Sequence, residues 1–156
     1  MLKRVLPLFC LLLLTACQTA PTEPSSSLYD ALGERKGIAA IVRDLLYIVV
    51  EDERIADKFK GVDIASLHRN LTDQICALAD GPCAYSGRSM PASHAGLGIT
   101  EAHFNALAED LILAMERNGV PVSAQNRLLA ELVPLHDDIV YQPAAPRGDA
   151  SRNNAP

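Results

Sequence analysis

The chain has 156 residues, of which 49% are hydrophobic, 21% are charged and 4% are aromatic, and it contains no tryptophan. This length and balance predict one globular domain with enough apolar residues for a core. The formal net charge of -5 argues against nucleic-acid binding, which needs a basic surface, and so few aromatic side chains offer no platform for stacking bases.

Residues 1–16 have the pattern of a bacterial export signal. The basic pair Lys3-Arg4 precedes an apolar stretch that is too short to span a bilayer, because a membrane helix needs about 20 apolar residues. The run Leu14-Thr15-Ala16-Cys17 then resembles a lipobox, in which a lipidated Cys17 becomes the first mature residue. The alternative is an ordinary signal with an incidental cysteine. Because Gln18 rather than an aspartate follows, we expect a lipid anchor in the cell envelope, at the periplasmic face of the outer membrane.

Two polar segments flank the expected domain. Residues 17–27 contain two prolines and three serines, which predicts a flexible tether. Residues 142–156 hold three prolines and no apolar periodicity, which predicts a disordered tail. The folded domain is therefore expected to span residues 28–141.

Within this domain, apolar residues recur with the spacing of helices. The first stripe consists of Ile38, Ile41, Val42, Leu45, Leu46 and Val49. The second consists of Ile64, Leu67, Leu71, Ile75 and Leu78, with Asp63 as its expected N-cap. No alternating strand pattern is visible, so the sequence predicts an all-α fold.

Two further stripes follow closer to the C-terminus. The third helix is expected to open at Thr100-Glu101 and to end at Asn118-Gly119, with an apolar stripe of Phe104, Leu107, Ala108, Leu111, Ile112 and Met115. The last helix is expected to be capped by Ser123 and kinked by Pro134, with an inward face of Leu128, Leu129, Leu132, Leu135 and Ile139.

A short segment between the second and third stripes carries the most informative pattern. Met90, His94 and Leu97 stand at i, i+4 and i+7, so they share one face of a short helix that Gly96 and Gly98 should end. A single imidazole on an apolar face suits one axial bond to a flat iron cofactor. From spacing alone, a histidine packed in a core is the more common explanation.

The surrounding residues resemble a known family. Tyr85, Gly87, Arg88, Met90, His94, the run from Gly96 to Thr100 and His103-Phe104 resemble the proximal-histidine region of the group-one truncated haemoglobins. The resemblance extends from about Leu28 to about Val140. It implies a two-over-two helical sandwich around haem b, with residues 38–51 and 64–78 on the distal side. The short His94 segment and the last two long helices would cover the proximal side.

The resemblance also implies roles for particular residues. His94 would be the proximal ligand of the iron, and its second ring nitrogen should donate to a backbone carbonyl near Met90, one turn earlier. Met90 and Leu97 would pack on the porphyrin, and Phe59 would lie against the haem.

On the distal side, this sequence departs from the family pattern. Leu46 occupies the position on the first distal helix where family members commonly have a tyrosine. Leu71 occupies the position on the second distal helix where a glutamine is common, and Leu67 occupies the gate position of that helix. Tyr47 is the next residue along the same helix. It would reach the pocket if the helix were rotated, or else pack against a neighbouring helix. We expect a drier distal pocket than in tyrosine-bearing relatives.

The other histidines and the cysteines leave alternatives open. His68 is either a solvated histidine at the rim of the buried stripe, or a contact of the haem edge or sixth ligand. His103 and His136 are expected at the surface, and no histidine pair has zinc-like spacing. Cys76 and Cys83 flank a Gly-Pro turn; they form a disulfide if their Cα atoms approach within about 7 Å, and remain buried free thiols otherwise.

Three functional hypotheses follow from these patterns. The first is reversible binding of oxygen, or of another diatomic gas such as nitric oxide or carbon monoxide. The second is a nitric oxide dioxygenase, which needs a reductase that the sequence does not identify. The third is a haem-free helical lipoprotein of the envelope. No catalytic triad, P-loop or dinucleotide motif is present to suggest another enzyme.

Overall fold

A computed structural model describes residues 26–140, and all regular structure within this range is helical. The prediction of an all-α fold is therefore confirmed. The expected signal peptide, the lipidation site Cys17, most of the tether and the C-terminal tail lie outside the described residues. No helix between residues 26 and 140 is both long enough and apolar enough to cross a membrane.

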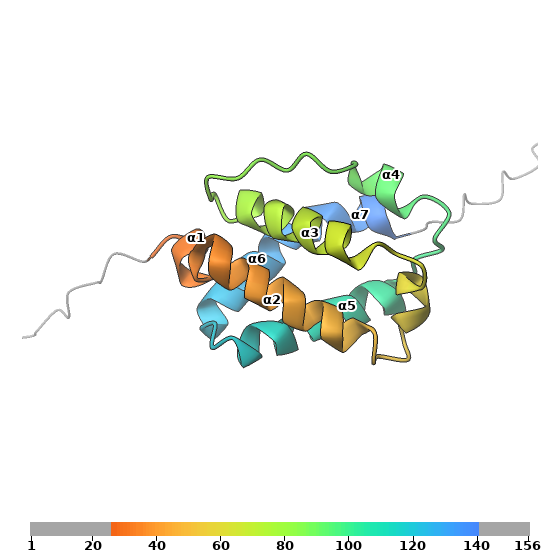
Figure 1. Cartoon of the computed structure of the whole chain (residues 1–156), viewed down its shortest axis with the longest axis horizontal. Helices are drawn as coiled ribbons and strands as arrows, with labels where there is room; N and C mark the ends of the chain where they lie inside the picture. The colour runs from red at the N-terminus through yellow and green to blue at the C-terminus, as the bar shows by residue number, and fades with distance from the viewer. Residues whose placement is uncertain (1–25, 141–156) are drawn as a thin grey trace, which may run out of the picture.

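The helices form two layers. In chain order they are α1 (Leu28–Ala31), α2 (Glu34–Val49), the 3-10 helix η1 (Ala56–Phe59), α3 (Ile64–Leu78), α4 (Met90–His94), α5 (Glu101–Arg117), α6 (Val122–Leu132), the 3-10 helix η2 (Val133–Leu135) and α7 (His136–Ile139). Figure 1 shows α2 and α3 together in front of α5 and α6, and α2 packs on both α3 and α5. This is the two-over-two arrangement that the resemblance predicts.

Two helices begin where the sequence predicts, because their caps are local. The carboxylate of Asp63 accepts a hydrogen bond from the backbone N–H of Ser66 at 3.1 Å, which satisfies a free donor in the first turn of α3. At the start of α5, the Thr100 hydroxyl accepts from the N–H of His103, and the His103 Nδ1 accepts from the N–H of Thr100 at 3.1 Å. This reciprocal pair is a capping box in which His103 takes the place usually held by an acid or amide.

The prediction that Ser123 caps the last helix is wrong. The predicted kink at Pro134 is a 3-10 turn that separates α6 from α7. Ser123 lies inside α6, whose N-cap is Pro121 without a side-chain hydrogen bond. The proline ring fixes φ near the helical value, which favours the start of a helix but leaves the first N–H groups of α6 without a side-chain acceptor. Pro134 has no N–H to continue the helix, and the chain passes through η2 before α7 resumes.

The apolar stripe of α2 forms the centre of the core, since all six of its predicted residues are buried. On α5 the buried face is rotated from the prediction and consists of Ala106, Asp110, Leu111, Ala114 and Met115. Phe104 and Leu107 are less buried, and both lie on the side of α5 that faces the cleft described below.

Cys76 and Cys83 are joined by a disulfide, with their Cα atoms 5.8 Å apart. The bridge ties the last turn of α3 to the loop that leads to α4. Gly81 makes the turn between them possible, because a Cβ at this position would lie only 2.7 Å from the Cys76 Sγ. The structure therefore contains the disulfide and not the pair of buried free thiols.

Candidate functional site

A cleft lies between the two layers and is made of two adjoining hollows. The outer hollow has a volume of about 290 Å³ and the inner hollow about 370 Å³, a size typical of ligand pockets. Residues from α3, α4, α5, α7 and η1 line both: Phe59, Leu67, Leu71, Gln74, Met90, His94, Phe104, Leu107 and Ile139. The inner hollow also has Leu45, Leu46 and Val49 of α2 in its wall.

His94 is the one imidazole that lines both hollows, and its ring is held in one orientation. Its Nδ1 lies 2.8 Å from the carbonyl oxygen of Met90, one turn earlier on α4, which confirms the predicted hydrogen bond. Because a carbonyl only accepts, Nδ1 carries the proton, and the Nε2 of the neutral ring keeps a lone pair. No residue in the described range makes a hydrogen bond to that Nε2.

The α4 helix ends immediately after His94 because of two glycines. Gly96 and Gly98 have φ values of +77° and +59°, which side chains with a Cβ rarely adopt. Leu97 therefore lies in a turn beyond the helix, and the predicted helical face shared by Met90, His94 and Leu97 is wrong for its last member. Leu97 is 44% exposed but still borders the outer hollow.

The apolar residues predicted to surround a cofactor are brought together. Phe59 comes from η1, Leu67 and Leu71 from α3, and Met90 from α4. Leu46, which is only 6% exposed, reaches the inner hollow from α2. These side chains present an apolar surface on both sides of the cleft.

Tyr47 does neither of the things predicted for it. Its side chain is 67% exposed and lines neither hollow. Successive residues on an α-helix are about 100° apart, so the burial of Leu46 turns Tyr47 toward solvent. The expectation that Tyr47 belongs to the cofactor site is corrected.

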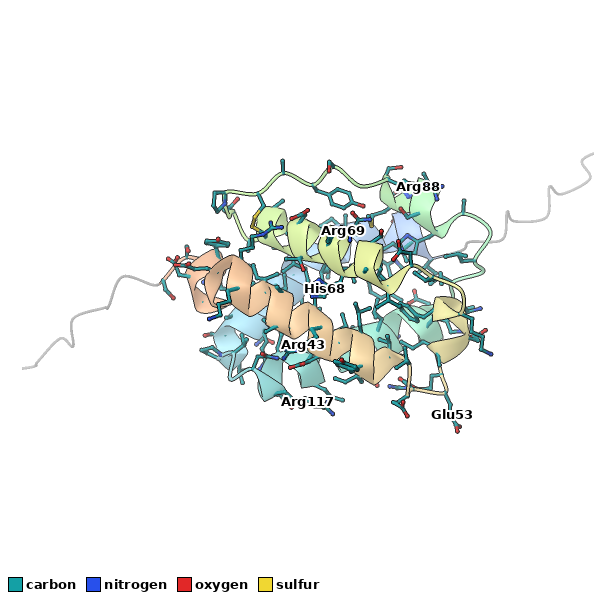
Figure 2. All side chains as sticks on the ribbon, viewed as in Figure 1. Arg43, Glu53, His68, Arg69, Arg88 and Arg117 are labelled. Carbon is teal, nitrogen blue, oxygen red and sulfur yellow. A yellow bond between two sulfur atoms is a disulfide. The ribbon has the colours of Figure 1, made fainter. Side chains whose placement is uncertain are left out.

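His68 also lies outside the cleft. Its Nε2 is 2.9 Å from the carbonyl oxygen of Ala39 on α2, and Figure 2 shows its side chain between α2 and α3. The carbonyl can only accept, so this nitrogen donates and helps to hold the two helices together. Neither a solvated rim position nor a sixth iron ligand describes this residue.

Two amides that the sequence analysis missed line the cleft. Gln74 borders both hollows and donates from Nε2 to the Met90 sulfur at 3.3 Å, and Asn70 borders the outer hollow. Both follow from the helical period, since residues 67, 70, 71 and 74 share one face of α3. The cleft thus has leucines at positions 46 and 71, but its wall is not wholly apolar.

Two basic side chains border the outer hollow. Lys58 and Arg88 are part of its wall, and Figure 2 places Arg88 beside α4. The Arg88 guanidinium also donates to the carbonyl of Ala92. An apolar cleft with the free Nε2 of His94 in both hollows and two cations at its outer part fits haem, which is flat and apolar and carries acidic groups at one edge.

His103 and His136 are half-buried and make specific contacts that the prediction of surface positions did not include. His103 forms the cap of α5 and lines the outer hollow. His136 packs edge-on against Phe104, with ring centroids 4.9 Å apart, and its two nitrogens lie 2.8 Å and 2.9 Å from carboxylate oxygens of Glu101 and Asp137.

A group of charges lies where the turn after α2 meets α5. Arg54 contacts Asp52 and Glu109, and it lies 3.9 Å from the buried Asp110. One oxygen of Asp110 has no hydrogen-bond partner. Burial, together with the charge of Asp52, raises the pKa of the Asp110 carboxyl.

Within residues 26–140, no three histidines, cysteines or acids are arranged to hold a metal ion by themselves.

Comparison with known proteins gives one consistent result. A family model described as bacterial-like globin matches residues 27–141. The group 1 truncated haemoglobin GlbN of Nostoc sp. is 36% identical over 61% of this chain and 80% of its own length. The GlbN protein of Mycolicibacterium paratuberculosis is 31% identical over 75% of this chain and 85% of its own length.

Solved structures agree with these sequence matches. The truncated haemoglobin of Tetrahymena pyriformis in its Fe(III) form superposes with a TM-score of 0.72 at 26% identity, over 75% of this chain and all of that one. The 2/2 haemoglobin of Synechococcus sp. PCC 7002, which has covalently attached haem, gives a TM-score of 0.69 at 27% identity, with the same coverage.

Proposed function

The chain belongs to the bacterial-like globin family, whose model matches residues 27–141, and on this premise we propose that it binds oxygen reversibly at a haem b held by His94. Membership of the family makes haem its cofactor and a diatomic gas its ligand. The identity of the iron ligand and the preference for oxygen are the steps that we add.

The single observation that carries the proposal is the state of the His94 ring. Its Nδ1 donates to the Met90 carbonyl, so the lone pair of Nε2 is free for coordination. A second-shell hydrogen bond of this kind fixes the tautomer of a histidine ligand and makes it more basic.

The other residues of the cleft support the same role. Haem supplies an iron atom at which a diatomic gas binds. The apolar side chains of Leu46, Leu67 and Leu71 exclude water from the gas-binding side, while Met90 and Phe59 offer apolar surface for the porphyrin. Lys58 and Arg88 lie where they could pair with carboxylates at the edge of the cofactor.

The first test is an absorption spectrum of the purified domain after addition of haem. We expect a Soret band, and, after chemical reduction of the iron, reversible spectral changes on addition and removal of oxygen. No Soret band at stoichiometric haem would favour the haem-free lipoprotein. Catalytic conversion of nitric oxide to nitrate by the oxygenated protein, with a supply of electrons, would favour the dioxygenase.

We also propose that Cys17 is lipidated and anchors the domain to the periplasmic face of the outer membrane. The support is the Leu14-Thr15-Ala16-Cys17 run. Changing Cys17 to Ser should block processing and leave a larger protein that retains its signal segment. Normal processing and release of the C17S variant from the membrane would contradict the lipid anchor.

A further inference from the structure

His136 contacts two carboxylates at once. Its Nε2 lies 2.8 Å from an oxygen of Glu101, the first residue of α5, and its Nδ1 lies 2.9 Å from an oxygen of Asp137 on α7. The imidazole is 24% exposed, whereas both carboxylates are more open to solvent. His136 therefore joins the start of α5 to α7.

The two contacts require a charged imidazole. A carboxylate can only accept, and a neutral histidine has a single N–H. Only the protonated ring can donate to Glu101 and Asp137 together, so loss of the proton must leave one of the two carboxylates without its hydrogen bond. This conclusion follows from the positions of the atoms alone.

The charged groups around His136 come from its own helix and from α5. Glu101 faces it from α5, and Asp137 and Asp138 lie beside it on α7. His103 is turned to the N–H of Thr100. The α4 helix packs against α7, and His94 is the one ionisable residue of that helix. No ionisable residue occurs in η2.

The elements that His136 joins also form one wall of the cleft. Phe104 packs edge-on against the His136 ring and lines both hollows together with His94. Ile139, one turn after His136 on α7, lines both hollows as well. A change in the position of α7 against α5 therefore reaches the side of the cleft that holds His94.

We propose that His136 is a positioning residue whose charged form clamps α7 to the start of α5 and holds Phe104 and Ile139 against the haem. The role in haem retention rests on the proposed function, whereas the clamp itself does not. When the ring loses its proton, it can donate to only one of the two carboxylates, and its contact with Glu101 on α5 is no longer an ion pair, so the wall formed by these two side chains loosens.

The direction of the pH effect follows from the contacts. The hydrogen bond to Asp137 raises the pKa of His136 above 6.5 although burial opposes it, and the bond to Glu101 adds to the rise. A group whose pKa is raised by folding stabilises the folded state fully below its unfolded pKa. That stabilisation is lost as the pH rises through the higher, folded value. The clamp should thus hold at pH 6.5 and weaken toward pH 8.5.

The chain offers a matched control for this clamp. Asp138 lies next to Asp137 and carries the same charge, but it is not an ion-pair partner of His136. The D137N and D138N variants therefore remove equal charge, and only D137N removes an ion pair of His136. The H136Q variant keeps a polar side chain of similar size but cannot become charged.

The experiment measures transfer of haem from the full-length protein to excess apomyoglobin at pH 6.5 and pH 8.5. In the wild type we expect release to be about two- to fivefold faster at pH 8.5, the range expected for an exposed ion pair. H136Q should release haem equally fast at both pH values, and D137N should lose most of the difference. D138N should behave like the wild type.

A second measurement follows the His136 ring directly, by NMR of the reduced, carbon-monoxide-treated protein. The ring should titrate at lower pH in D137N and E101Q than in the wild type, with D138N showing the smallest change. A pH dependence retained in H136Q, or equal effects of D137N and D138N, would overturn the proposal.

Failure of the clamp and failure of the proposed function are distinguishable. A missing Soret band would refute haem binding, and the clamp would then be read from thermal unfolding at the same two pH values. The wild type should lose more stability than H136Q between pH 6.5 and pH 8.5. Equal losses would overturn the clamp whether or not haem binds.

Discussion

The two sides of the cleft are built by different interactions. On the proximal side, hydrogen bonds between His94 and Met90, between Thr100 and His103, and from His136 to two carboxylates hold the parts in place. On the distal side, Leu46, Leu67 and Leu71 are placed by packing. Directional bonds hold the His94 ring in one orientation, whereas apolar packing makes a wall in which Gln74 is the amide that borders the inner hollow.

The disulfide connects these two sides, and its removal should have the largest effect on stability. Cys76 ends the distal helix α3, and Cys83 belongs to the loop that leads to α4. Replacing both cysteines with alanine should lower the free energy of unfolding by about 2–4 kcal/mol, because the unfolded chain gains conformational freedom. Denaturant unfolding of the oxidised protein measures this loss.

Intact mass under alkylating conditions provides the control for that variant. The wild-type chain should take up no label at Cys76 or Cys83 before reduction. Two labels, together with unchanged stability of the double variant, would show that the cysteines are free thiols.

The apolar character of the distal side should be visible in oxygen release. A tyrosine at position 46 would place a hydroxyl donor at the inner hollow. A hydrogen bond from it to bound oxygen, which carries partial negative charge, is worth about 1 kcal/mol or somewhat more. The L46Y variant should therefore release oxygen up to about tenfold more slowly. Carbon monoxide is less polar, so its binding should hardly change. Stopped-flow kinetics with both gases test this, and equal slowing of both would point to steric blockage instead of a hydrogen bond.

The smallest effect is expected at the neighbouring position. Because Tyr47 is exposed and lines neither hollow, removal of its hydroxyl in Y47F should change stability by less than about 0.5 kcal/mol. Oxygen release should stay within error of the wild type. A tenfold acceleration would mean that Tyr47 reaches the gas and that the distal side is polar.

The parts of the fold that sequence alone could predict are those with local causes. The six buried residues of α2 follow a helical period, and Asp63 and Thr100 act as caps through hydrogen bonds to residues three positions away. The hydrogen bond from His94 to Met90 is local in the same sense, since it spans one turn. Such features need no knowledge of what packs against them.

The parts that could not be predicted depend on neighbours far along the chain. His68 bonds to Ala39, and His136 bonds to Glu101, so their roles required the positions of two helices at once. The rotation of α5 that buries Asp110 has the same origin. Gln74 is different, because its helical spacing from Leu67 already places it on the face of α3 that lines the cleft. An amide does not belong to an apolar stripe, so the hydrophobic pattern alone does not include it.

The most direct test of the account is the absorption spectrum of the H94G variant. Removal of the only imidazole that lines both hollows should abolish the native Soret band, and free imidazole, which fits the space left by the side chain, should restore it. His68 bonds to the backbone of α2 instead, so the H68A variant should keep the band. A native spectrum in H94G, combined with loss of the band in H68A, would contradict the assignment of His94 as the iron ligand.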